Sequence, residues 1–139
     1  MSARDKPVQG ACLCGSVAFH IKGPMRDVIA CHCVECRRQS GHYWAATSVA
    51  ERDLEMVRQE GLRWYNASES VTRGFCELCG STLFYVPDGE ARVVVSAGAL
   101  KPGTGLRLTK HVFVAEQGDY YSIGDHLPVF EGFSGAEHA

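Results

Sequence analysis

The chain has 139 residues, a formal net charge of −2 at pH 7 and 45% hydrophobic residues. This length favours one domain, and the slightly acidic balance argues against a nucleic-acid-binding domain, which usually carries a basic surplus. No apolar run approaches the roughly 20 residues that span a bilayer, and residues 1–7 lack the apolar core of a signal peptide. We therefore expect a cytoplasmic protein without a membrane segment, in a compartment where thiols stay reduced.

The chain is predicted to form a series of short strands. Alternating apolar residues at 17–21 predict a half-buried strand. Further strands are predicted over 42–49, 54–57, 62–65, 81–86, 92–97, 111–114 and 120–123. Frequent turns between short strands favour a mainly β fold of antiparallel strands with few short helices. We expect one domain over residues 10–130, with flexible termini at 1–9 and 131–139.

All seven cysteines fall into three clusters. The clusters are Cys12 and Cys14, then Cys31, Cys33 and Cys36, then Cys76 and Cys79. In a reducing compartment, clustered thiols are more often metal ligands than disulfides, and the odd number points the same way. Four thiols suit a closed tetrahedral zinc site, and three suit a site with one open position. Seven cysteines divide into one set of each kind.

The first and last clusters are predicted to share a structural zinc. Cys12 and Cys14 face the same side if their segment is extended. Cys76 and Cys79 form a knuckle, in which Gly80 allows the backbone to fold beneath the metal. The alternatives are unpaired structural thiols or a redox Cys-x-x-Cys pair, but the segment after Gly80 does not resemble the helix start of a redox pair.

Cys31, Cys33 and Cys36 are predicted to form a second zinc site. A strand that ends near Cys31 and continues into a helical turn would bring the three sulfurs together and point His32 away. Three ligands leave one position for water or substrate, and a thiol bound there would be held as thiolate. The alternative is a structural site that His32, His42 or another side chain closes.

Charged residues around this cluster are candidates for substrate binding and proton transfer. Arg37 and Arg38 can attract an anionic thiol compound, although both could equally belong to a solvated helix face. His32, His42 and Glu35 are candidates for the general acid or base only because they are near in sequence. None of the three has a convincing partner in the sequence.

Three motifs carry a resemblance to a known family. They are Gly-Ala-Cys-Leu-Cys-Gly at 10–15, Cys-His-Cys-Val-Glu-Cys-Arg-Arg-Gln-Ser-Gly at 31–41 and Phe-Cys-Glu-Leu-Cys-Gly-Ser at 75–81. Their order and spacing resemble the glutathione-dependent formaldehyde-activating family, which includes centromere protein V. Weaker matches at 95–100, 111–113 and 127–130 extend the resemblance from about residue 10 to residue 130.

The resemblance implies a zinc-ribbon-like β-tent fold with two zinc ions. Cys12, Cys14, Cys76 and Cys79 would hold a structural zinc, and Cys31, Cys33 and Cys36 a labile or catalytic one. The implied activity is a carbon–sulfur lyase-type reaction of S-(hydroxymethyl)glutathione synthase, which joins glutathione and formaldehyde. The chain departs from the family at residues 101–102, where acidic residues are common, and at residues 120–121, where a tryptophan is common. If these regions line the pocket, the substrate differs.

Two other classes of function compete with this enzyme. One is a non-catalytic zinc-braced binding module or thiol carrier, in which Tyr43, Trp44, Trp64 and Tyr65 could line the surface. The other is a nucleic-acid zinc ribbon, which the acidic charge balance disfavours. The expected partner is a small-molecule thiol such as glutathione, with neither nucleic acid nor membrane involved.

Overall fold

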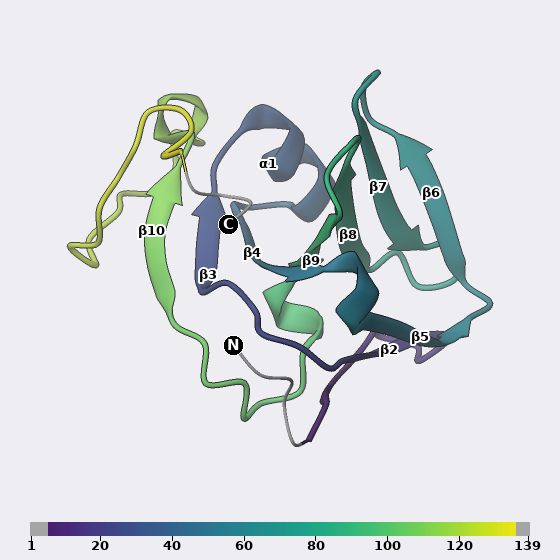
Figure 1. Ribbon diagram of the computed structural model, residues 1–139. Helices are drawn as coiled ribbons and strands as arrows, with labels where there is room; N and C mark the ends of the chain where they lie inside the picture. The colour runs from purple at the N-terminus through teal and green to yellow at the C-terminus, as the bar shows by residue number, and fades with distance from the viewer. Residues whose placement is uncertain (1–5, 136–139) are drawn as a thin grey trace.

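The computed structural model describes residues 6–135 of the chain, and in this part it has ten strands and one α-helix (Figure 1). The strands are β1 Val8–Ala11, β2 Val17–Ile21, β3 Val28–Cys31, β4 Trp44–Ala50, β5 Leu54–Gln59, β6 Leu62–Asn66, β7 Val71–Cys76, β8 Thr82–Pro87, β9 Arg92–Ser96 and β10 Leu108–Val112. Helix α1 spans Val34–Ser40, and three single 3₁₀ turns cover Glu51–Asp53, Ala97–Ala99 and Val114–Glu116. The prediction of a mainly β fold of short strands is confirmed.

The strands form two sheets that meet near Gly61. The small sheet has the order β1-β2-β5, and the large sheet has the order β10-β3-β4-β9-β8-β7-β6. β5 belongs to the small sheet and β6 to the edge of the large one, so the turn between them joins the two sheets (Figure 1). A Cβ atom on Gly61 would lie 2.7 Å from the Cys76 sulfur, so only glycine allows this close approach.

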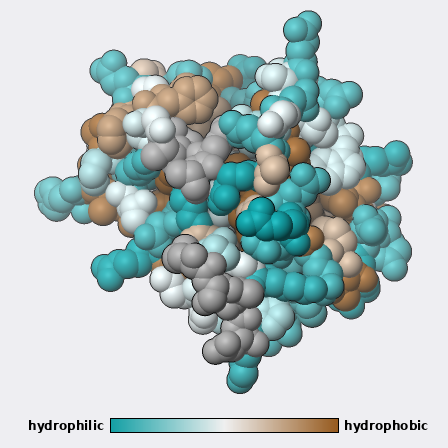
Figure 2. Space-filling view, in the orientation of Figure 1, coloured by the Kyte–Doolittle hydropathy of each residue, from teal (hydrophilic) through white to brown (hydrophobic). Residues whose placement is uncertain are grey.

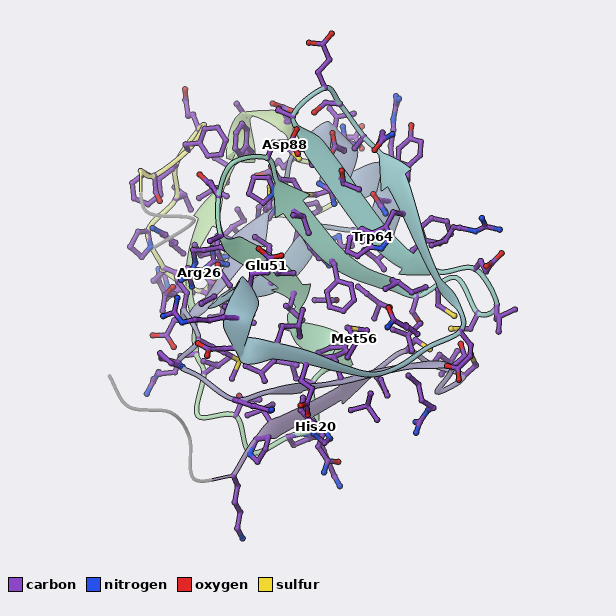
Figure 3. All side chains as sticks on the ribbon, turned by 45° about the vertical axis from the view of Figure 1, so that its right-hand side comes forward. His20, Arg26, Glu51, Met56, Trp64 and Asp88 are labelled. Atoms are coloured by element: carbon purple, nitrogen blue, oxygen red, sulfur yellow. The ribbon has the colours of Figure 1, made fainter. Side chains whose placement is uncertain are left out.

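The core lies between the two sheets. Phe19 of the small sheet and Phe84 of the large sheet are buried and meet edge to face, with ring centroids 5.1 Å apart. Figure 3 shows Met56 on the inner side of the small sheet and His20 on its outer side, as strand alternation requires. A Cβ atom on Gly10 would lie 2.4 Å from the Phe19 ring, so the neighbouring strand approaches this ring closely.

The large sheet is apolar on both faces at β9. Val93 and Val95 belong to the core beneath the small sheet, whereas Val94 packs with Trp44 and Cys36 on the opposite face. The continuous apolar run predicted at 92–97 therefore reflects burial on both sides. Helix α1 lies over this second face, beside the ends of β3 and β4 (Figure 1).

Two local rules set the bounds of α1. Cys33 is the N-cap, and its sulfur accepts a hydrogen bond from the backbone N–H of Cys36 at 3.3 Å. Gly41 ends the helix with a φ of 92°, and its N–H donates to the Arg37 carbonyl at 2.8 Å. The predicted strand end followed by a helical turn is confirmed, with Gly41 as the stop.

The prediction of a strand at 120–123 is wrong. This segment is a turn followed by irregular chain. Strand β10 pairs with β3 in parallel, and its other edge is taken by residues 128–130, which bond to the backbone of His111. Because that edge is occupied, residues 120–123 do not pair with β10. The parallel β3–β10 pair also departs from the expected antiparallel arrangement.

The N-terminal part of the expected flexible segment 1–9 lies outside the described residues, as do residues 136–139. Val8 and Gln9 belong to β1, and Val8 is buried in the core because β1 pairs with β2 along its whole length.

The described chain has no helix with the length and apolar character needed to cross a membrane. On the face that Figure 2 shows, hydrophobic residues occur in separate areas among hydrophilic ones.

Replacing Phe19 with alanine should lower the free energy of unfolding by about 3–5 kcal/mol, because the ring is fully buried against Phe84. Urea denaturation of metal-loaded protein measures the change. Tyr65→Ala is the matched control, since this ring is 59% exposed on β6 and should change stability by less than about 0.5 kcal/mol. Similar losses in the two variants would contradict the core assignment.

Candidate metal centres

The structure brings together the four cysteines of the first and last clusters. The sulfurs of Cys12, Cys14, Cys76 and Cys79 all lie within 4.8 Å of one another. The Cys12–Cys14 sulfur distance is 3.7 Å and the Cys14–Cys76 distance is 3.8 Å. Four sulfurs arranged tetrahedrally at about 2.3 Å from a zinc ion lie about 3.8 Å apart, whereas a disulfide needs about 2.05 Å. The donor set therefore fits a closed tetrahedral metal site.

The same Cys-Gly-Ser triplet occurs on both sides of this site. Gly15 and Gly80 follow Cys14 and Cys79 with φ values of 83° and 81°, which turn the chain so that a serine faces the sulfurs. The triplets are residues 14–16 and 79–81. The two serines were missed in the sequence, although the repeated triplet is a signal that could have identified them.

Both serine hydroxyls contact the sulfur atoms. Ser16 Oγ lies 3.1 Å from the Cys14 sulfur and 3.2 Å from the Cys76 sulfur, and Ser81 Oγ lies 3.2 Å from the Cys79 sulfur. Hydrogen bonds from the side chain and backbone of Ser81 lower the pKa of Cys79 to about 5. These contacts stabilise thiolates, which is the form that binds a metal.

Cys31, Cys33 and Cys36 form a second group, with their sulfurs also within 4.8 Å of one another. Cys31 ends β3, Cys33 caps α1, and Cys36 is buried in the first turn of the helix. A hydrogen bond from Cys31 lowers the pKa of Cys33 to about 2, and the same contact raises the pKa of Cys31. Cys33 therefore ionises readily, and its negative charge disfavours the ionisation of Cys31. A bound cation would let all three ionise together.

Neither predicted histidine joins this group of ligand atoms. His32 is fully buried, and its Nε2 lies 2.8 Å from Nδ1 of His111, so its side chain points away from the sulfurs as predicted. His42 Nδ1 pairs with the Tyr120 hydroxyl at 2.6 Å. Among the residues that the structure describes, three ligands therefore meet at this site.

A hydrogen-bonded chain with two buried histidines lies behind the segment that carries Cys31 and Cys33. His111 Nε2 pairs with Asp125 Oδ2 at 2.7 Å, His111 Nδ1 pairs with His32, and His32 Nδ1 pairs with the Tyr121 hydroxyl. The contacts are satisfied if each histidine carries its proton on Nε2 and Tyr121 donates to His32. Burial, followed by the charge of His111, lowers the pKa of His32 to about 4, so this histidine is neutral.

This chain of contacts holds the 31–33 backbone against the segment after β10. His111, Tyr121 and Asp125 were given no role from the sequence, because they lie between 79 and 93 residues from His32 along the chain.

A pocket with a volume of about 140 Å³ opens beside the second cluster. Its walls are formed by Arg26, Ile29, Cys31, Cys36, Trp44, Ala46, Arg73, Tyr85, Val94, Val112, Phe113 and Phe133. Most of these side chains are apolar. Two side chains in the wall carry a fixed positive charge. Arg26 comes from the segment before β3 and is labelled in Figure 3, and Arg73 comes from β7.

Arg73 is the polar side chain buried most deeply at this pocket, with 1% of its surface exposed. Its Nε donates to Glu35 Oε1 at 2.5 Å, and its Nη2 donates to the Cys36 sulfur at 3.4 Å. The guanidinium lies 5.3 Å from the Trp44 ring and 4.9 Å from the Tyr85 ring. These aromatic faces and Glu35 stabilise a buried cation next to the Cys36 sulfur.

The predicted pair Arg37 and Arg38 lies on the other side of α1 and does not line the pocket. Arg37 Nε donates to the Glu116 carbonyl at 2.8 Å, and Arg38 is exposed. Of the predicted surface aromatics, Trp44 lies in the pocket wall, whereas Trp64 and Tyr65 are exposed on β6.

Comparison with known proteins identifies the family. The model for the glutathione-dependent formaldehyde-activating enzyme family matches residues 7–116. The chain belongs to this family. The resemblance carried by the three cysteine motifs is therefore confirmed.

The chain is also similar to two individual proteins. The chain is 25% identical over 125 residues to an uncharacterized lyase of Schizosaccharomyces pombe, covering 88% of this chain and 89% of that protein. A crystal structure of a Rhodobacter sphaeroides protein superposes with a TM-score of 0.58 at 25% identity, covering 68% of this chain and 88% of that one.

The two cysteine groups should bind one metal ion each. Cys33→Ser should lower the metal content from two ions per chain to one and leave the fold intact. Cys76→Ser should remove the other ion and cost several kcal/mol, because a structural metal contributes on the order of 10 kcal/mol to folding. Plasma mass spectrometry with thermal unfolding measures both. One ion in the unmodified protein, or equal destabilisation in both variants, would contradict two separate sites.

Tyr121→Phe should lower the free energy of unfolding by about 1–3 kcal/mol, because it leaves the buried Nδ1 of His32 without a hydrogen-bond donor. Tyr120→Phe removes the same hydroxyl from an exposed pair with His42 and should cost less than about 0.5 kcal/mol. Denaturant unfolding compares the two, and equal effects would rule out the buried chain of contacts.

Proposed function

We propose that this protein is a zinc-dependent carbon–sulfur lyase-type enzyme that acts on the adduct of a thiol and an aldehyde. Glutathione and formaldehyde are the pair that the family's name supplies. The observation that carries the proposal is the contrast between the two cysteine groups. One group offers four sulfurs, and the other offers three sulfurs beside an apolar pocket.

The donor sets support zinc as the metal in both sites. All seven ligands are thiols, which favour zinc over hard cations such as magnesium and calcium. In this proposal Cys12, Cys14, Cys76 and Cys79 hold the structural ion, and Cys31, Cys33 and Cys36 hold the catalytic one. Zinc at the second site would lower the pKa of a bound thiol and present it as the thiolate that adds to the aldehyde carbon.

The protein's own side chains have two tasks around the second site. Arg73 places a positive charge 3.4 Å from the Cys36 sulfur, which offsets the excess negative charge of several thiolates. The apolar pocket walls, including Trp44 and Val94, reduce the contact of water with the buried Cys36 sulfur. His32 acts as a positioning residue, because its contacts with His111 and Tyr121 fix the backbone between Cys31 and Cys33. Arg37 and Arg38 would attract an anionic thiol from the exposed side of α1.

A thiol carrier is the second candidate function. It is favoured by the absence of histidine and carboxylate side chains from the pocket wall in the described part of the chain. A carrier needs only the sulfur-binding position, whereas an enzyme also needs a route for the proton. We place either function in the cytoplasm, where free thiols stay reduced.

Titration calorimetry of zinc-loaded protein with glutathione tests the shared step. Glutathione should bind and S-methylglutathione should not, because the methyl group removes the thiolate that would bind zinc. Cys33→Ser, with its metal content checked, should abolish the glutathione signal.

Equal binding of glutathione and S-methylglutathione would place recognition on the peptide and remove zinc from the chemistry. Binding of glutathione to a Cys33→Ser protein that lacks the second ion would have the same consequence. If glutathione binds as expected, release of formaldehyde from the adduct at a rate above the uncatalysed one would distinguish the enzyme from the carrier.

A further inference from the structure

Arg73 has one nitrogen that the fold does not use. Its Nε and Nη2 donate to Glu35 and Cys36, but Nη1 is buried and has no hydrogen-bond partner among the residues that the structure describes. A buried donor without a partner is costly, and for a charged group the cost is larger still. The contacts of Nε and Nη2 are enough for Arg73 to stabilise the Cys31–Cys33–Cys36 group. They do not explain why a third nitrogen, Nη1, is buried without a partner.

The pocket that Arg73 lines has two arginines in its wall, Arg26 and Arg73, and no described aspartate or glutamate. Glu35, which pairs with Arg73 Nε, does not line it. Arg26 bonds to the Ala46 carbonyl at 2.8 Å, which fixes its position in the wall. The Trp44 and Tyr85 rings flank Arg73, so a planar guanidinium is held in one orientation. A carboxylate is the planar anion that a fixed guanidinium binds best.

The size of the pocket limits the ligand. Its volume of about 140 Å³ is below the roughly 300–1,000 Å³ of pockets that enclose drug-sized ligands. A dry cavity of about this volume holds one benzene-sized molecule. The remainder of a tripeptide thiol would have to lie outside. The pocket itself therefore suits a short carbon chain.

The position of Arg73 limits how far the anion lies from the sulfur. Nη2 is 3.4 Å from the Cys36 sulfur, and the sulfurs of Cys31, Cys33 and Cys36 lie within 4.8 Å of one another. An anion on the adjacent nitrogen of the same guanidinium is therefore close to the place where a substrate sulfur would join the three cysteines. Few bonds can separate the two groups.

We propose that Arg73 binds the carboxylate of a compact thiol acid whose carboxylate sits on the carbon next to the sulfur or on the one beyond it. The proposal rests on the proposed function, because it requires a substrate sulfur at the Cys31–Cys33–Cys36 metal. It makes Arg73 a specificity-determining residue and gives such thiol acids an advantage over neutral thiols of the same length.

Calorimetric titration of the zinc-loaded protein with mercaptoacetate and with methyl mercaptoacetate tests this proposal. The two probes share the sulfur and the carbon chain and differ in charge. Mercaptoacetate should bind at least about tenfold more tightly, which corresponds to one charge-assisted hydrogen bond. The ester has the more acidic thiol, so sulfur ligation alone would favour the ester.

Two matched variants locate the effect. Arg73→Gln keeps an amide donor but removes the charge, and it should abolish the preference for the acid. Arg52→Gln removes an exposed arginine that does not line the pocket and should leave the preference unchanged. Zinc content and thermal unfolding show whether Arg73→Gln is folded and keeps its metal. The variant is needed because mercaptoacetate can also chelate zinc through its carboxylate, which would favour the acid without Arg73.

The outcomes separate the two proposals. Equal binding of acid and ester would overturn the role of Arg73 and leave sulfur binding at the metal intact. A preference that survives in folded Arg73→Gln would also overturn it. Binding of neither probe would overturn the sulfur site, and with it both proposals.

Discussion

The convergence of residues 12–14 with residues 76–79 is the constraint on which the rest of the structure depends. It joins two segments that are 62 residues apart, one at the end of β1 and one at the end of β7, beside the Gly61 turn where the two sheets meet. The two Cys-Gly-Ser triplets turn both segments so that their sulfurs and hydroxyls face the same point. A metal held there would fix the angle between the sheets, and the large sheet then carries the second cysteine group on its opposite face.

The two cysteine groups differ in what surrounds them. The four-sulfur group lies among serine hydroxyls and backbone, and a metal there would have no ligand position left. The three-sulfur group lies next to a buried arginine, two aromatic rings and an apolar pocket. A buried charge without a complete set of partners is unfavourable to folding. Its retention at this place is therefore best explained by binding, and not by stability.

The sequence predicted the features that depend on local spacing. The grouping of Cys31, Cys33 and Cys36 follows from a strand end joined to a helical turn, and Gly41 as a stop follows from the freedom of glycine. Features that depend on distant contacts were not predictable. Nothing in the sequence near Arg73 indicates burial, because the residues that surround it, Trp44, Tyr85 and Cys36, are distant along the chain. The segment at 120–123 has strand-forming residues, but residues 128–130 occupy the edge of β10, and Tyr121 contacts His32 instead.

In this account one metal site is closed and the other has an exchangeable position. Replacement of zinc by cadmium-113 and nuclear magnetic resonance of the metal test this claim most directly. We predict two cadmium resonances, of which one, absent in Cys33→Ser, shifts when a thiol is added while the other does not move. A single resonance in the unmodified protein would contradict two metal sites. Two resonances that both stay unshifted when the thiol is added would contradict an exchangeable position.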